Sequence, residues 1–163
     1  MIRYFVLLLL SFQLSAQSTD KVKAINNYID FTNDCIPGLT ISHLMLQSFN
    51  NEINEIVDAT EDFAFKNSDF GRDIYSDPSY YEHRGLSPTQ LFPKMKKEGK
   101  ILGAEAKNLD ELTTKIFDLC QKLNELRFET GDYIEKHDLK SEQNLDVVYQ
   151  KLEKGVLLFD EVY

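Results

Sequence analysis

Apolar residues recur at steps of three and four along most of the chain, the spacing that stacks side chains on one face of an α-helix. The first stripe comprises Val22, Ile25, Ile29, Thr32 and Ile36. Beyond Pro37 and Gly38 it resumes with Leu39, Met45, Leu46, Phe49, Ile53, Ile56 and Val57. Because proline lacks an amide and clashes with the preceding turn, this pattern predicts either one kinked helix from about residue 19 to 65 or two helices meeting at Pro37.

Two further stripes follow in the second half of the chain. One begins near Leu102 or Asn108 and contains Leu109, Leu112, Ile116, Cys120, Leu123 and Leu126. Gly131 and the polar run after Tyr133 permit a turn, and a last helix from about Ser141 is expected to bury Leu145, Val148, Leu152, Val156, Phe159 and Val162. No segment shows the sustained period-two alternation of a β-strand. The predicted fold is therefore all-α, an antiparallel helical bundle of three to four long helices.

Residues 66 to about 100 interrupt this pattern and form an aromatic-rich connection. Three of the four prolines lie there, and so do three glycines. Because a structureless connection of this length is uncommon in compact domains, we expect it to carry short helical turns. Ser87-Pro88-Thr89-Gln90 has the composition of a capping box with proline at the first helical position, which predicts a helix start.

The same connection supplies the candidate binding surface, which consists of Tyr75, Tyr80, Tyr81, Arg84 and Phe92. Aromatic faces beside polar groups suit glycans and protein partners. The alternative is that these rings pack against one end or side of the bundle and complete its small core.

The N-terminus has the pattern of an export signal. Arg3 precedes an apolar run from Phe5 to Leu14, and Ser15 and Ala16 offer a small-residue cleavage site. The run is about half of the roughly 20 residues that a membrane-spanning helix needs. The expected organisation is a signal peptide over residues 1–16 and one helical-bundle domain over residues 17–163, with no transmembrane segment after signal removal. Such a protein is periplasmic, outer-membrane-associated or secreted.

Charge narrows the range of partners. The 163 residues include 18 lysines and arginines against 27 acidic residues, for a formal net charge of −9. Nucleic acid is therefore not an expected partner, because phosphate binding needs a basic face. The one basic cluster contains Lys94, Lys96, Lys97 and Lys100. It is interpreted as a solvated helix face, with contact to anionic lipid headgroups or to an acidic partner as the alternative.

Cys35 and Cys120 are the only cysteines, and they lie 85 positions apart near the apolar faces of two predicted helices. Export places them in an oxidising compartment, where disulfides persist. They are therefore a candidate disulfide. The alternative is two buried free thiols, since cysteine is among the most buried residue types and bridging needs a geometry that sequence does not supply.

No catalytic signature is present in the sequence. It contains no H-E-x-x-H, G-x-S-x-G, phosphate-binding glycine loop or C-x-x-C, and its three histidines are dispersed. We therefore expect no catalytic residue, cofactor or metal, and a non-enzymatic envelope module with an interaction or architectural role. Its partner would be another envelope protein or a cell-wall glycan; the sequence sets no oligomeric state. The alternative is a ligand-binding or sensor domain that uses the aromatic surface for a glycan, peptide or small molecule.

Two stretches also resemble known families. The sequence Lys23-Ala24-Ile25-Asn26-Asn27-Tyr28-Ile29, with the later Leu119, Leu123, Tyr133, Leu152 and Phe159, resembles YiiG-like bacterial envelope proteins of unknown function. A second set of positions is similar to the helical N-terminal region of some Bacteroidetes envelope proteins that carry an OmpA-like domain downstream. This set comprises Tyr28, Phe31-Thr32-Asn33, Phe49-Asn50, Ile53-Asn54, Asn67, Asp69, Asp73-Ile74-Tyr75 and Ser87-Pro88. Either resemblance implies a helical envelope protein, and neither supplies a catalytic residue.

Overall fold

The computed structural model describes residues 19–58, 75–76 and 86–162. These residues form four α-helices and a 3-10 turn, with no strand among them: α2 (Thr19–Asp58), α3 (Pro88–Gly99), η3 (Lys100–Leu102), α4 (Ala104–Lys136) and α5 (Glu142–Val162). The predicted all-α bundle is confirmed. The expected signal peptide and about half of the aromatic-rich connection lie outside the described residues.

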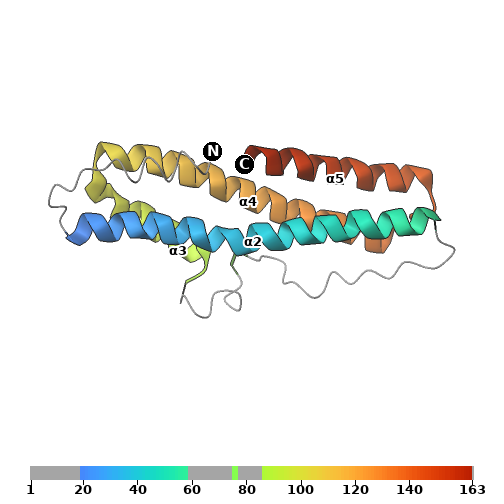
Figure 1. Cartoon of the computed structure of the whole chain (residues 1–163), viewed down its shortest axis with the longest axis horizontal. Helices are drawn as coiled ribbons and strands as arrows, with labels where there is room; N and C mark the ends of the chain where they lie inside the picture. Colours follow the sequence, from blue (N-terminus) through green and yellow to red (C-terminus); the bar gives the residue numbers. More distant parts are fainter. Residues whose placement is uncertain (1–18, 59–74, 77–85, 163) are drawn as a thin grey trace.

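Consecutive helices alternate in direction, so α2 and α4 run parallel while α3 and α5 run antiparallel to both (Figure 1). Contacts between the parallel helices extend from Phe31 against Phe117 to Met45 against Arg127. The α3 helix covers the first half of this pair and α5 covers the second half. The molecule therefore consists of two three-helix halves that share α2 and α4.

Each half has its own hydrophobic core. In the first, Phe31 of α2 packs against Phe92 of α3 and Phe117 of α4, with ring centroids 5.2 and 5.5 Å apart. Aromatic pairs in such tilted and edge-on arrangements are favourable beyond the apolar area that they bury. The second core contains Phe49 and Ile53 of α2, Leu123 and Leu126 of α4, and buried residues of α5.

The α2 helix is one continuous element, which confirms the single-helix alternative over its described range, with the exposed Pro37 inside it. The predicted buried stripe of its first half is wrong, because Ile36 is 54% exposed and Val22 is also exposed. The buried positions are Ala24, Tyr28, Phe31 and Cys35. The helix turns its two large aromatic side chains toward α3 and α4, and this places the aliphatic residues beside them at the margin or in solvent.

Predicted boundaries in the second half were close to those observed. The α4 helix begins after Gly103, whose φ of 63° is a left-handed conformation that glycine adopts without strain. Gly131 does not end the helix but lies buried within it, and the turn follows Lys136 instead. Leu112 was expected in the core and is exposed. The α4 face that packs in the first core is the one carrying Phe117 and Cys120, which turns Leu112 outward.

The α3 helix begins where the sequence predicted. The backbone N–H of Ser87 donates to the side-chain Oε1 of Gln90 at 3.1 Å, which is the reciprocal arm of the expected capping box. Pro88 occupies the first helical position, where its missing amide removes no helical hydrogen bond.

Tyr28 links the three helices of the first half. Its hydroxyl donates to the Asp110 Oδ1 of α4 at 2.7 Å, and its ring lies so close to Gly99 of α3 that a Cβ there would collide with it. Burial, and secondarily the hydrogen bond to Asp110, raise the pKa of Tyr28 well above its ordinary value. The folded protein therefore holds the phenol neutral in mildly alkaline solution.

Removing the hydroxyl through Tyr28→Phe is expected to lower the free energy of unfolding by about 1 kcal/mol near neutral pH. The phenol of the unfolded chain ionises near pH 10. Because the folded-state pKa of Tyr28 is raised, the protonated phenol contributes fully to the free energy of unfolding below about pH 10. Above that pH the free energy of unfolding falls by about 1.4 kcal/mol per pH unit. Chemical unfolding of both proteins across this range should show a shallower alkaline decline for the variant. Parallel declines would contradict the assignment.

Candidate docking groove

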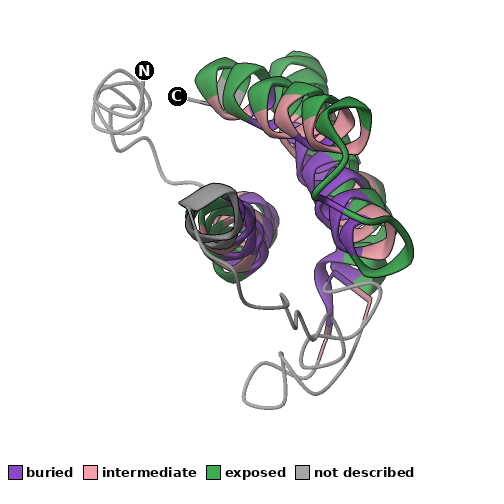
Figure 2. Ribbon diagram, turned by 90° about the vertical axis from the view of Figure 1, so that its right-hand side faces the viewer, coloured by how far each residue is buried: buried purple, intermediate pink, exposed green. Residues whose placement is uncertain are grey.

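A groove of about 790 Å³ lies between α2 and α5, over the second core. Viewed along the bundle, α2 stands on one side and α4 with α5 on the other, and their buried residues face one another (Figure 2). The groove is lined from α2 by His43, Leu46, Gln47 and Asn50, and from α5 by Asp146, Tyr149, Gln150, Leu152, Glu153, Gly155, Val156, Phe159 and Asp160. A volume of this size falls within the range of ligand and peptide sites.

Gly155 sets the depth of the groove. A Cβ at this position would lie 3.0 Å from Leu46 Cδ1 of α2 and 3.5 Å from Leu126 Cδ2 of α4. The absent side chain thus lets three helices meet closely along one line. Beyond this line α2 and α5 diverge, and Val156 and Leu157 are 60% and 62% exposed, the highest values for large apolar side chains among the described residues.

The two walls of the groove differ in chemistry. The α2 wall presents the polar side chains of Gln47 and Asn50, and its His43 ring meets the Phe159 ring edge-on at 5.3 Å. The α5 wall contributes an apolar strip that contains Tyr149, Leu152, Val156 and Phe159. The groove therefore has an apolar strip on its α5 side and, on its α2 side, mainly polar side chains with no carboxylate, lysine or arginine among them.

All the carboxylates that line the groove come from α5. Asp146, Glu153 and Asp160 are spaced seven residues apart, so they form one row along the outer edge of the helix, with successive residues about 10 Å apart. Each of these side chains is exposed. No lysine or arginine is present among the described residues that line the groove. The edge of the groove is consequently negative.

Val156 was expected to point inward, and its exposure corrects that prediction. The α5 helix buries Val148, Gly155 and Leu158, so its contact face is rotated away from Val156. The groove itself was missed at the sequence level. Two signals were available: a glycine inside an apolar helix, and a row of acidic residues at heptad spacing beside an apolar stripe.

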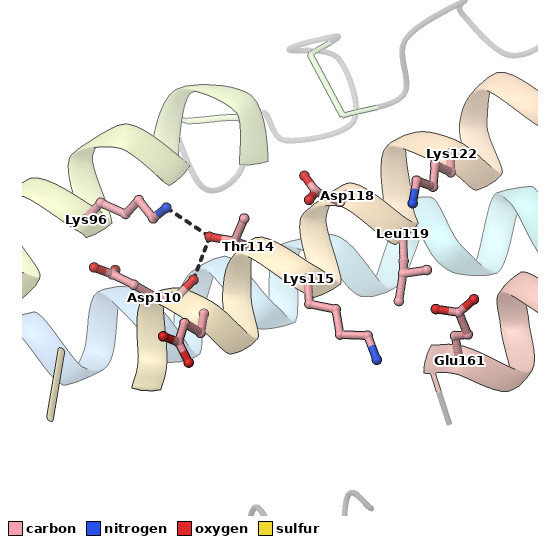
Figure 3. Close-up of a pocket in the computed structure, with 9 residues that line it drawn as sticks. Lys96, Asp110, Thr114, Lys115, Asp118, Leu119, Lys122 and Glu161 are labelled. Atoms are coloured by element: carbon pink, nitrogen blue, oxygen red, sulfur yellow. Dashed lines mark hydrogen bonds between the residues drawn. The ribbon is translucent and has the colours of Figure 1, made fainter. Parts of the chain in front are cut away.

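A second cavity, of about 450 Å³, lies over α4 between α3 and the end of α5. Its lining combines three lysines with four acidic residues and a single apolar side chain, Leu119. Lys96 reaches from α3 and donates to Thr114 Oγ1 at 2.8 Å, while Glu161 projects from the end of α5 (Figure 3). The mixed charges and the single apolar residue of its lining suit an apolar segment less well than the groove does.

The candidate aromatic surface is only partly within the described residues. Tyr75 is fully buried, in edge-on contact with Phe117 and packed against Gly38, so it is a core residue and not part of a surface. Phe92 is half-buried, with its ring 4.8 Å from that of Phe117. Burial of these two rings agrees with the packing alternative. Tyr80, Tyr81 and Arg84 lie outside the described residues.

Cys35 and Cys120 are brought together across the α2–α4 contact. Both side chains are fully buried, both are free thiols here, and the two thiols lie within hydrogen-bonding reach of each other. Hydrogen bonding to Cys120 and burial raise the pKa of the Cys35 thiol well above its usual value, so it is protonated. Tyr75 lies beside Cys120. The structure therefore brings the two sulfurs close together, while the disulfide between them stays a prediction.

A buried arginine ties α2 to α4 in the second half. Arg127 is fully buried, and its Nε and Nη2 donate to Asn124 Oδ1 at 3.2 and 2.7 Å. Its Nη1 lies 3.1 Å from the Met45 sulfur of α2. A buried guanidinium needs such partners, because desolvation of an unpaired charge is costly.

Among residues 19–58, 75–76 and 86–162, no group of three or more histidine, cysteine or acidic side chains is arranged to hold a metal ion. Over the same residues, no helix combines the length and apolarity needed to cross a membrane. Comparisons with protein-family models, curated proteins and solved structures find no match to this chain. The resemblances to YiiG-like and OmpA-like envelope proteins therefore stay predictions.

Proposed function

We propose that this protein is an exported, non-enzymatic module of the cell envelope that binds another protein through the groove between α2 and α5. The observation that carries the proposal is the groove itself, an apolar strip with a polar edge on the surface of a helical bundle. Apolar grooves between helices bind amphipathic segments of partner proteins. The export signal in residues 1–16 supports the location.

The exposed apolar residues of α5 favour an interaction role over a purely architectural one. Val156 and Leu157 are adjacent and more than half exposed, and Val156 continues into the apolar strip of the groove. Contiguous exposed apolar surface with a polar edge is typical of interaction sites, whereas singly scattered apolar residues are not informative.

Cross-linking in the cells that naturally produce the protein tests this proposal. A photoreactive side chain in place of Tyr149, which lines the groove, should give one defined protein adduct. Val156→Arg should abolish the adduct, because the bulky charge enters the apolar strip. Leu112→Arg is the matched control, since Leu112 is also an exposed large apolar residue but lies on α4, outside the groove lining. It should leave the adduct in place.

Absence of an adduct, or equal loss in both arginine variants, would contradict a groove-dependent interaction. The exported protein should also begin at Gln17, and mass measurement checks this. An intact N-terminus on protein retained in the cytoplasm would contradict the location.

A further inference from the structure

We propose that the partner of the groove is a basic amphipathic helix, which inserts its apolar stripe between α2 and α5 and directs lysines or arginines toward Asp146, Glu153 and Asp160. This rests on the proposed function, because it names the chemistry of the partner for the same groove. The inference rests on the carboxylate row, the apolar strip beside it and the opposite wall, which contains no carboxylate, lysine or arginine.

The geometry of α5 favours a helix over a compact ligand. Its three groove carboxylates lie on one edge at steps of seven residues, so the row extends for about 20 Å. Tyr149, Val156 and Phe159 follow the same direction immediately inside this row. A helix that carries apolar and basic residues at matching heptad spacing meets both rows at once, as in a bundle whose fourth helix is supplied by a partner.

Charge complementarity selects the sign of the partner. The described groove lining contains three carboxylates and no lysine or arginine. These carboxylates are exposed, so ion pairs with them are individually weak and are screened by salt, but they orient a helix and disfavour an acidic one. The net charge of −9 attracts a basic partner at longer range as well.

The same charges disfavour a second copy of this chain as the occupant. A two-fold contact would place the same patch of both copies face to face, so that two carboxylate rows would enter one interface. Like charges placed in this way repel, and no lysine or arginine of the described lining offsets them.

Binding of synthetic peptides to the mature chain tests the proposal. The probe is a helical peptide of about 20 residues, long enough to span about 30 Å, with leucines at the a and d positions and lysines beside them. A second peptide has glutamates in place of the lysines, and a third has the lysine composition in scrambled order. Fluorescence anisotropy should show binding of the lysine helix alone, and its Kd should increase with salt concentration.

Two charge-matched triple variants locate the binding site. The groove triple variant combines Asp146→Asn, Glu153→Gln and Asp160→Asn. It should weaken binding of the lysine helix by about tenfold, as expected for the loss of three exposed ion pairs. The control triple variant combines Asp30→Asn, Glu105→Gln and Glu125→Gln. It changes the net charge by the same amount, at exposed positions outside the groove. This control triple should leave the Kd within about twofold.

The outcomes separate this inference from the proposed function. Preference for the glutamate helix, equal binding of the scrambled peptide, or equal weakening in both triples would overturn the inference. So would a dimer of the unliganded protein that Val156→Arg dissociates, because a second copy would then fill the groove. If the groove-dependent adduct still forms in cells, the docking function survives such a failure. Loss of the adduct as well would overturn both.

Discussion

Oxidation of Cys35 and Cys120 to a disulfide is expected to raise the free energy of unfolding by up to about 4–5 kcal/mol, because the bridge closes a long loop in the unfolded chain. The two thiols are already close neighbours across α2 and α4. Two protons and two electrons pass to a disulfide oxidant of the export compartment. Because both side chains are fully buried, we expect the bridge to form before the helices close or when they open.

Mass measurement on protein isolated from an oxidising compartment checks this prediction. The denatured chain should lack two hydrogens until reductant is added, and it should show no thiol open to alkylation. Reduction should lower the Tm, and Cys35→Ser should remove the difference between oxidised and reduced samples. Two alkylatable thiols in the denatured, unreduced protein would contradict the bridge.

Arg127→Ala is expected to lower the free energy of unfolding by about 3–5 kcal/mol, through the loss of buried volume and of hydrogen bonds. The substitution leaves a void between α2 and α4 and deprives Asn124 Oδ1 of two guanidinium donors. Because Arg127 is fully buried, water does not replace these contacts without disturbing the second core.

Arg127→Met separates the two effects, because methionine restores most of the volume but no donor. Its expected loss is about 1–2 kcal/mol, from the lost guanidinium hydrogen bonds to Asn124. Lys107→Ala is the surface control; Lys107 is exposed and pairs only loosely with Glu111 at 3.9 Å, so a change within about 0.5 kcal/mol is expected. Denaturant unfolding measures all three. A loss below about 1 kcal/mol for Arg127→Ala would contradict this role.

The local features of this fold were predictable because they depend on neighbouring residues. The start of α3 follows from Ser87, Pro88 and Gln90, and the start of α5 was expected within a residue of its position. Periodicity also identified helices as the only regular elements of the described residues. It placed the buried face of α2 incorrectly, because apolar periodicity does not weigh the large rings of Tyr28 and Phe31 against the aliphatic residues beside them.

The groove and the buried arginine depend on which helices pack together, and periodicity does not specify this. Val156 continues the apolar stripe of α5, yet it is exposed because α2 packs along α4 and contacts α5 much less. Arg127 lies four residues after Leu123 on the same face of α4, but its charge alone predicted exposure. The proximity of Cys35 and Cys120 likewise required the parallel alignment of α2 and α4.

The division into two cores also has a dynamic consequence. Because α5 belongs to the second core and α3 to the first, sub-global opening of α5 can leave the α2–α3–α4 half folded. The helix that carries the carboxylates of the groove thus contributes to one core only. In the proposed complex, displacing α5 to widen the groove would disrupt the second core alone and leave the first core folded.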